Sequence, residues 1–272
     1  MKKILLYSSI TLLTLIIVGA IVVKESIVHI QLPHGARLHI LPGPKNNQVR
    51  GAVIICPGGG YGYLEKWNEG YMWFPYFLKQ GYTVAMLEYR MPKGNYRIPM
   101  TDACEAIRVM RCRANEWHFD KDNVGFMGFS AGGHLASTML VTDVDSVRPN
   151  FGILFYPVIS MKKELTHKGS HDRLLGEDAS EQLETLFSNE LHVSVETPPT
   201  YIAVADDDKC VNPVNSRRFY DAMCDKGCLV TLHVYPSGGH GWGNRFSFEH
   251  HSQMLENLDE WLKEYKQKRN KQ

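Results

Sequence analysis

The sequence lacks a dominant charge sign, internal repeats and paired-cysteine motifs. Its 272 residues carry 30 basic and 29 acidic side chains, so the formal net charge is +1. Such a balance excludes a protein that holds nucleic acid by bulk electrostatic attraction. No C-x-x-C pair is present to suggest a zinc or redox site. What is present is a globular composition, 44% apolar, with room for one large domain or two small ones.

The first 25 residues have the pattern of a targeting segment. Lys2 and Lys3 precede an uncharged run over residues 4–23, and a small-residue cleavage site ends at Ala20. As a helix this run would be long enough to cross a bilayer, which needs about 20 apolar residues. Two alternatives stay open, a cleaved signal peptide and an uncleaved N-terminal membrane anchor. Both predict that residues 26–272 form one exported domain, periplasmic or secreted.

The six cysteines would permit disulfides in an exported chain. However, a domain of about 250 residues buries enough core to fold without covalent staples. Most of the six lie in apolar stretches, where cysteine behaves as a small hydrophobic side chain. The sequence therefore favours free thiols at Cys56, Cys104, Cys112, Cys210, Cys224 and Cys228.

Short apolar runs alternate with amphipathic stretches along the rest of the chain. Buried strands are expected where such a run ends in Gly, Pro or Asp, at residues 52–56, 82–87, 123–128, 151–155, 201–205 and 229–235. Helices are expected over residues 71–79, 100–117, 131–140, 215–226 and 253–265. This alternation predicts an α/β fold with a mostly parallel central sheet and helices on both faces.

Two regions depart from that alternation. Residues 25–45 are predicted to form an antiparallel lead-in at the sheet edge. Residues 161–199 are polar, carry little strand signal and fall between two predicted strands. Because this segment is too long for a simple connection, we interpret it as an insertion that covers the carboxyl edge of the sheet.

Residues 128–134 have the pattern of a nucleophile elbow. They follow a predicted strand and open a predicted helix, and the motif G-x-S-x-G centres on Ser130. Its glycines suit a turn too tight for bulky neighbours. The N–H of Ala131 would lie at the helix N-terminus, where donors are unpaired and negative charge is favoured. His134 is interpreted as a polar residue at the helix start. The alternative is a glycine-rich structural turn.

Three glycines follow the first strong strand, in Pro57-Gly58-Gly59-Gly60-Tyr61. They allow the backbone to turn its amides toward a ligand, and in a hydrolase such a loop supplies an oxyanion donor. The N–H of Tyr61 or Gly60 is the expected donor. A phosphate cradle and a plain turn are the alternatives. A phosphate loop would place Lys and Ser/Thr after the last glycine, where Tyr61 and Gly62 stand.

A histidine and three carboxylates follow the last two predicted strands. His240 lies among the glycines of residues 238–243, which indicates an exposed loop rather than the core. The consecutive carboxylates Asp206-Asp207-Asp208 repel one another, which is unfavourable in a purely structural turn. A capping turn or a calcium site is the alternative. The order Ser130, Asp208, His240 is the chain order of α/β-hydrolase triads.

Taken together, these segments resemble the α/β-hydrolase family of carbohydrate esterases, which includes acetyl xylan esterases and relatives of feruloyl esterases. The resemblance spans about residues 50–245 and rests on Cys56 to Tyr61, Leu87 to Arg90, Asp102 to Trp117, Gly128 to His134, Leu165 to Ser170 and Gly239 to Gly241. It implies an α/β-hydrolase fold, with Ser130 as nucleophile, His240 as base and no metal or cofactor. The acid of such families stands in D-x-x-V-P. Asp208 matches this spacing, with Asn212 in place of the proline, and Asp207 is the second candidate.

The resemblance implies a serine esterase that works through an acyl-enzyme. The expected substrate is an acetyl group on a plant-type polysaccharide or oligosaccharide, so the partner is an acylated carbohydrate or another small ester. No nucleic acid is expected, and a membrane is contacted only through an uncleaved N-terminal segment. A feruloyl esterase and a prolyl oligopeptidase-type serine peptidase are the alternatives. A catalytically dead binding protein is disfavoured because every catalytic residue type is present.

Aromatic side chains crowd the predicted active-site loops, and sugar rings pack well on aromatic faces. Trp242, Tyr61 and Trp67 are the candidates for substrate binding, with Tyr63 and Trp73 nearby. Ordinary packing is the alternative. Two histidine pairs with a spacing that would allow metal binding are interpreted as solvated side chains, namely His167 with His171 and His250 with His251.

Overall fold

The computed structural model describes residues 26–45 and 50–271. The predicted targeting segment, residues 1–25, lies outside these ranges. Within them, no helix is both long enough and apolar enough to cross a membrane.

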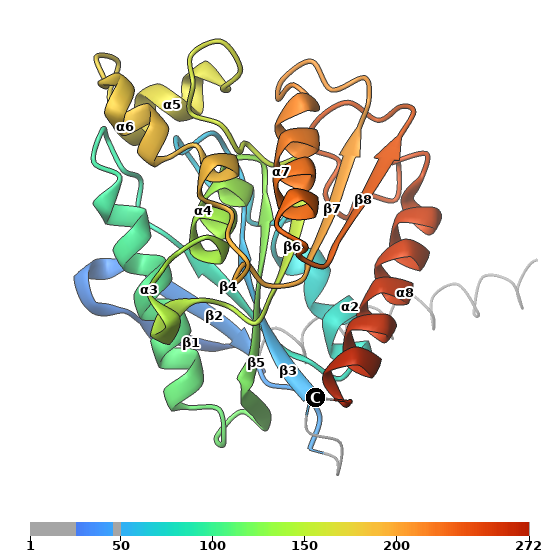
Figure 1. Ribbon diagram of the computed structural model, residues 1–272. Helices are drawn as coiled ribbons and strands as arrows, with labels where there is room; N and C mark the ends of the chain where they lie inside the picture. Colours follow the sequence, from blue (N-terminus) through green and yellow to red (C-terminus); the bar gives the residue numbers. More distant parts are fainter. Residues whose placement is uncertain (1–25, 46–49, 272) are drawn as a thin grey trace, which may run out of the picture.

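One eight-stranded sheet runs through the described part of the chain (Figure 1). Its strands are β1 (Val28–Gln31), β2 (Arg37–Leu41), β3 (Arg50–Cys56), β4 (Thr83–Glu88), β5 (Phe119–Phe129), β6 (Phe151–Phe155), β7 (Thr200–Ala205) and β8 (Val230–Tyr235). They are ordered β1-β2-β4-β3-β5-β6-β7-β8. β2 is antiparallel to its neighbours β1 and β4, and the other paired strands are parallel. The predicted mostly parallel sheet with an antiparallel lead-in is confirmed.

Helices cover both faces of this sheet (Figure 1). They are α2 (Phe74–Lys79), α3 (Arg97–Cys112), α4 (Ser130–Leu140), α5 (Lys168–Leu175), α6 (Glu181–Leu186), α7 (Val214–Asp225) and α8 (His251–Arg269). The helix predicted over residues 71–79 is instead a 3₁₀ turn, Tyr71–Trp73, followed by α2. Pro75 has no N–H to bond the carbonyl of Tyr71, so the regular α-helix begins beside the proline.

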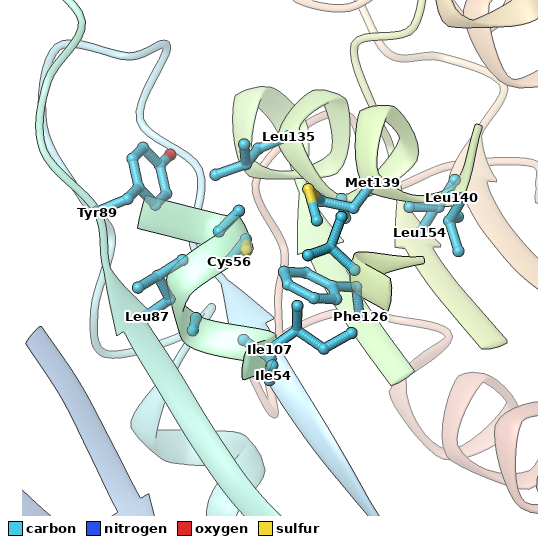
Figure 2. Packing of buried hydrophobic residues seen from close by; sticks show 14 of the residues in the cluster. Ile54, Cys56, Leu87, Tyr89, Ile107, Phe126, Leu135, Met139, Leu140 and Leu154 are labelled. Atoms are coloured by element: carbon cyan, nitrogen blue, oxygen red, sulfur yellow. The ribbon is translucent and has the colours of Figure 1, made fainter. Parts of the chain in front are cut away.

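Alternate residues of the central strands face two separate hydrophobic layers. Ile54 and Cys56 of β3 pack with buried side chains of α3, α4 and α7 (Figure 2). Val53 and Ile55 point to the opposite layer, which contains buried side chains of α2 and α8. This period of two is that of a strand buried on both faces. The six cysteines are free, as the sequence favours, although only Cys56 is buried.

The insertion, residues 161–199, carries α5, α6 and a 3₁₀ turn, Asn189–His192. α5 and α6 lie above the carboxyl ends of the strands, as expected for a segment that covers this edge (Figure 1). No helix is predicted here from the sequence pattern. Both helices are short, and a short helix depends on contacts with its surroundings rather than on its own propensity.

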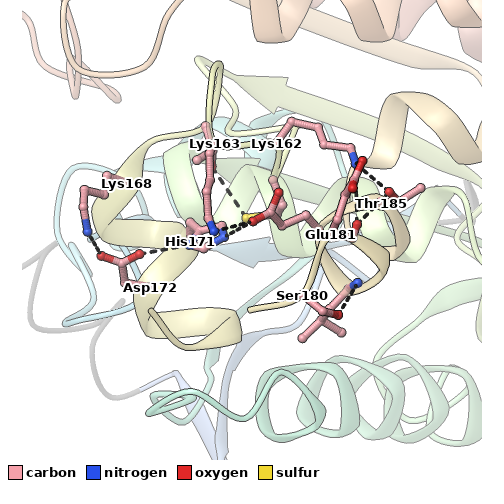
Figure 3. A network of polar contacts seen from close by, with 12 residues as sticks. Lys162, Lys163, Lys168, His171, Asp172, Ser180, Glu181 and Thr185 are labelled. Carbon is pink, nitrogen blue, oxygen red and sulfur yellow. Dashed lines mark hydrogen bonds and ion pairs between the residues drawn. The ribbon is translucent and has the colours of Figure 1, made fainter. Parts of the chain in front are cut away.

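A network of polar contacts links side chains of the insertion (Figure 3). His171 is 2% exposed and lies 2.9 Å from Asp172 and 3.3 Å from Glu184. Lys163 pairs with Glu184 at 3.3 Å, and Lys168 pairs with Asp172. Of these contacts, the one between His171 and Glu184 joins α5 to α6. Apolar side chains of the two helices, Leu174, Leu175 and Leu183, pack in or against the hydrophobic core.

Candidate active site

Ser130 stands at a strained turn between β5 and α4. The strand ends at Phe129 and the helix begins at Ser130, whose φ is 52°. A Cβ at Gly132 would lie 2.1 Å from the carbonyl oxygen of Cys56, and a Cβ at Gly128 would lie 2.3 Å from the carbonyl oxygen of Gly132. Both positions therefore require glycine, which is why the G-x-S-x-G spacing forms an elbow here.

The imidazole of His240 joins the serine hydroxyl to a carboxylate. Its Nε2 lies 2.8 Å from Oγ of Ser130, and its Nδ1 lies 2.6 Å from Oδ2 of Asp208. Ser130 and Asp208 are buried, whereas 18% of the His240 side chain is exposed. The three residues follow β5, β7 and β8 in turn. Side chains far apart in the sequence thus meet at the carboxyl edge of the sheet.

Consecutive carboxylates at this edge have different partners. Oδ1 of Asp208 accepts two backbone N–H groups of its own turn, which leaves Oδ2 directed toward His240. Asp207 instead accepts the N–H of Gly239 at 2.8 Å. Of the two candidates for the acid, the geometry therefore favours Asp208, and Asp207 supports the loop that carries the histidine.

The glycine loop passes directly beside the nucleophile. A Cβ at Gly58 would lie 2.9 Å from the Cβ of Ser130. Gly59, Gly60 and Tyr61 have φ values of 123°, 60° and 58°. Their N–H groups have no hydrogen-bond partner within the described residues. The donors expected from the sequence, Gly60 and Tyr61, therefore lie in a loop beside Ser130 with their amides unpaired.

Side chains from distant elements hold this loop in place. The hydroxyl of Tyr89 donates to the carbonyl of Pro57 at 2.7 Å. Arg173 of α5 donates to the carbonyl of Gly60 at 3.0 Å. The insertion thus contacts the active-site loop directly through an arginine that the sequence analysis did not single out.

The Tyr61 ring is buried, with 1% of the residue exposed, so its predicted role in substrate binding is corrected. Its hydroxyl lies 3.0 Å from Nδ1 of His134, whose Nε2 lies 2.8 Å from the carbonyl oxygen of Phe187. Burial lowers the pKa of His134 to about 4, so the imidazole is neutral near pH 7. His134 is therefore a buried tie between the elbow helix, the glycine loop and the insertion, rather than a simple polar residue at a helix start.

The predicted aromatic platform is only partly available to a substrate. Trp242 is 4% exposed and stacks on Phe248 with ring centroids 4.3 Å apart, so its predicted binding role is corrected. Trp67 is 65% exposed and Tyr63 is 63% exposed. Phe246, 83% exposed, was missed because the sequence analysis stopped at the glycines around the histidine. The exposed aromatic set therefore keeps Trp67 and Tyr63 from those expected, loses Trp242 and Tyr61, and gains Phe246.

The two histidine pairs have partners other than a metal. His171 bonds carboxylates of the insertion, as described above. His251 lies 2.8 Å from Oδ1 of Asn244, and His250 lies 3.1 Å from Oγ of Ser237. Across residues 26–45 and 50–271, no three His, Cys, Asp or Glu side chains are placed to hold a metal ion.

Two buried polar side chains beside the site were also missed. Glu69 accepts hydrogen bonds from the N–H of Gly58 at 2.7 Å and from the hydroxyl of Tyr156 at 2.8 Å. Glu69 stands between Asn68 and Gly70, a polar stretch with no pattern that signals burial. Tyr156 follows a predicted strand at the carboxyl edge, which was the available signal.

An eight-stranded sheet with a serine elbow after its central strand and an acid and a histidine after later strands defines the α/β-hydrolase class. The family model described as BD-FAE matches residues 38–223, well over half of the chain. The chain belongs to the BD-FAE family.

Two relatives with named activities match the chain by sequence. The acetylxylan esterase of Xylanibacter ruminicola is 40% identical over 224 residues, which cover 81% of this chain and 46% of that protein. The endo-1,4-beta-xylanase B of Butyrivibrio fibrisolvens is 31% identical over 207 residues, 71% of this chain and 32% of that protein. The chain thus spans less than half the length of these two relatives.

A solved structure matches most of the chain. The acetyl ester-xyloside bifunctional hydrolase of Caldicellulosiruptor lactoaceticus is 30% identical, with a TM-score of 0.78, over 85% of this chain and 89% of that one. The carboxylesterase Cest-2923 of Lactobacillus plantarum, at 19% identity and a TM-score of 0.74, covers 90% of this chain and 98% of that one and shares the fold. Together with the eight-stranded sheet, these similarities show that the chain has the α/β-hydrolase fold.

Proposed function

We propose that this protein is a serine esterase that removes acetyl groups from a plant-type polysaccharide or oligosaccharide. The observation that carries the proposal is the position of His240, within hydrogen-bond distance of both Ser130 and Asp208. A hydroxyl, an imidazole and a carboxylate in series are the arrangement that activates a serine for attack. The relatives named as acetylxylan esterase and acetyl ester-xyloside hydrolase support an acetylated carbohydrate as the substrate.

In the proposed reaction, Nε2 of His240 takes the proton from Ser130 as Oγ attacks the ester carbonyl. Asp208 holds the imidazole with its proton on Nδ1 and stabilises the cation that forms. The imidazolium then donates its proton to the leaving sugar oxygen, which leaves an acetyl-serine. Water attacks the acetyl-serine with His240 again as base, which releases acetate and restores the serine.

The negative oxygen that forms at each attack requires donors that are already in place. The N–H of Ala131 lies in the first turn of α4, where helix donors are unpaired. The unpaired N–H groups of Gly60 and Tyr61 are the candidates for the second donor. Removing one such donor typically raises the barrier by about 3 kcal/mol.

The exposed aromatic side chains Trp67, Tyr63 and Phe246 support a carbohydrate substrate. They come from two loops that lie side by side, since the N–H of Asn244 donates to the carbonyl of Asn68 at 3.0 Å. Trp67→Ala should therefore slow the turnover of acetylated xylo-oligosaccharide much more than that of a small aryl acetate. Equal losses on both substrates would remove these rings from the substrate site.

Hydrolysis of p-nitrophenyl acetate by the wild type and by Ser130→Ala tests the mechanism. We expect the variant to fold normally and to lose nearly all turnover, and full activity in Ser130→Ala would contradict the proposal. A panel of acetylated xylan, feruloylated oligosaccharide and a peptide amide then tests the substrate class. Preference for the second or third substrate would favour a feruloyl esterase or a serine peptidase instead.

We further propose that the enzyme is exported, either as a secreted or periplasmic domain or as one anchored by its N-terminus. The support is the basic start and uncharged run within residues 1–25. N-terminal sequencing of the protein from medium, periplasm and membranes distinguishes cleavage after Ala20 from an intact anchor. Recovery of the intact chain from the cytoplasm alone would contradict export.

A further inference from the structure

Glu69 is a buried carboxylate that makes no ion pair with a lysine or arginine of the described residues. Only 3% of the residue is exposed. Burial raises its pKa, and the hydrogen bonds from Tyr156 and Gly58 act in the opposite direction. A buried charge without a neutralising partner is unfavourable unless its oxygens are fully hydrogen-bonded. Groups of this kind beside an active site are candidates for a functional role.

The two oxygens of this carboxylate contact two different loops of the site. Oε2 accepts the N–H of Gly58 at 2.7 Å, and Oε1 accepts the hydroxyl of Tyr156 at 2.8 Å. A Cβ at Gly58 would lie 2.7 Å from Oε2 of Glu69 and 2.9 Å from the Cβ of Ser130. A side chain at Gly58 would therefore collide with both Glu69 and the nucleophile, so the backbone of the glycine loop lies close to both.

Tyr156 extends this contact to the loop that carries the histidine. Its hydroxyl accepts the N–H of Gly243 at 2.8 Å, and its ring lies edge-on to the ring of His240 with centroids 4.7 Å apart. Because the hydroxyl accepts that N–H, its own proton is directed to Glu69. Glu69 must then accept on both oxygens, as a carboxylate does. An amide in the same place offers one acceptor and one donor.

We propose that Glu69 is a positioning residue of the esterase reaction, an inference that rests on the proposed function. Its carboxylate fixes the glycine loop relative to Ser130 and, through Tyr156, fixes the loop that carries His240. Neither Glu69 nor Tyr156 needs to touch the ester. Since a misplacement of about 1 Å in a catalytic site lowers the rate by about 100-fold, loss of this tie lowers kcat far more than it weakens substrate binding.

The test compares Glu69→Gln with Glu184→Gln, because each replaces a buried carboxylate by its amide. Glu184 is 5% exposed, and its side chain bonds His171 and Lys163 within the insertion. With p-nitrophenyl acetate, we expect Glu69→Gln to lower kcat by about 10- to 100-fold, as losses of supporting hydrogen bonds do, with KM within about threefold. Glu184→Gln should keep kcat within about twofold of the wild type. Equal losses of kcat at equal losses of melting temperature would overturn the proposal.

Tyr156→Phe provides a second test that keeps the ring against His240 and removes the hydroxyl. We expect kcat to fall by about fivefold or more, and the double variant with Glu69→Gln to be no slower than Glu69→Gln alone, because both changes break one linkage. If Glu69→Gln does not fold, an unchanged kcat in Tyr156→Phe overturns the proposal by itself.

Ser130→Ala in the same assay separates this proposal from the one it rests on. If Ser130→Ala hydrolyses the ester at the wild-type rate, the serine esterase is refuted, and the positioning role is refuted as well. Hydrolysis that requires Ser130 but proceeds at full rate in a folded Glu69→Gln refutes the positioning role alone.

Discussion

The catalytic rim and the insertion are built by different physical means. The catalytic rim is defined here as residues 57–61, residues 128–132 and the turns that carry Asp208 and His240. The geometry of the rim is set by its backbone, since Ser130 has a positive φ and Gly132 has no space for a side chain. The insertion, residues 161–199, is held by side chains, through the hydrogen bonds of His171 and through Leu174 and Leu175 in the hydrophobic core. The rim therefore tolerates few substitutions, whereas the insertion can change in sequence at its exposed side chains.

The largest effect is expected within the catalytic rim, at the acid. Asp208→Asn keeps the shape of the side chain but favours the wrong imidazole tautomer, so kcat for p-nitrophenyl acetate should fall by about 10⁴-fold. Asp207→Asn weakens only the bond to the N–H of Gly239 and should lower kcat by less than about tenfold. Steady-state kinetics measures both. A greater loss in Asp207→Asn would transfer the acid's role to that residue.

A glycine-to-alanine substitution in each region compares how much stability is lost when a methyl group is added to the backbone. In Gly132→Ala the new Cβ would lie 2.1 Å from the carbonyl oxygen of Cys56, and we expect destabilisation by about 4 kcal/mol or more. In the insertion, Gly176 has a φ of 96° and nothing within 4 Å of an added Cβ. Since Gly176 also has a ψ of 153°, a conformation used almost only by glycine, Gly176→Ala should cost only backbone strain, about 1–3 kcal/mol. Urea unfolding measures both, and equal costs would end the distinction.

His134, which links the catalytic rim to the insertion, should make the free energy of unfolding depend on pH. Burial places its folded-state pKa at about 4, below the ordinary value of 6.5. Between these values the unfolded chain binds a proton that the folded chain does not. Stability therefore falls as pH drops from 6.5 to 4, by roughly 3 kcal/mol from this group, with no contribution above 6.5.

Replacing that imidazole should remove its share of the pH dependence. In His134→Gln, the unfolding free energy should change less between pH 7 and pH 4 than in the wild type, as measured by chemical denaturation at each pH. The same slope in both proteins would show that the proton is taken up elsewhere.

The smallest effect is expected on the outer surface of the insertion. Lys168, whose side chain is 83% exposed, pairs with Asp172 one turn later in α5, and ion pairs at the surface contribute little to stability. Lys168→Ala should leave both the melting temperature and kcat unchanged. A clear fall in melting temperature would mean that the insertion is less tolerant than its exposed pairs suggest.

Features that depend on local signals could be predicted from the sequence. Residues 151–155 coincide with β6, because an apolar run bounded by polar residues and proline leaves little choice of register. The elbow at Ser130 follows from glycine spacing, and chain order then points to Asp208 and His240. These side chains stand on turns directly after strands, and such turns have local sequence signals.

Features that depend on packing between distant segments could not be predicted in this way. Trp242 has an aromatic side chain suited to a sugar, but only the fold brings Phe248 against it. Glu69 is buried because the turns that follow β3, β6 and β8 surround it. In the same way, α5 and α6 depend on contacts with other segments, since Leu174 and Leu175 of α5 lie in the hydrophobic core and His171 contacts Glu184 of α6.

The order of the strands has a consequence for when activity first arises. β5, β6, β7 and β8 lie side by side in the same order as they occur in the chain, and Ser130 is made long before His240. A nascent polypeptide that stops short of β8 therefore contains the hydroxyl without its proton acceptor. Under the proposed mechanism, such a precursor cannot activate its serine, and the triad is complete only when the segment that follows the last strand docks.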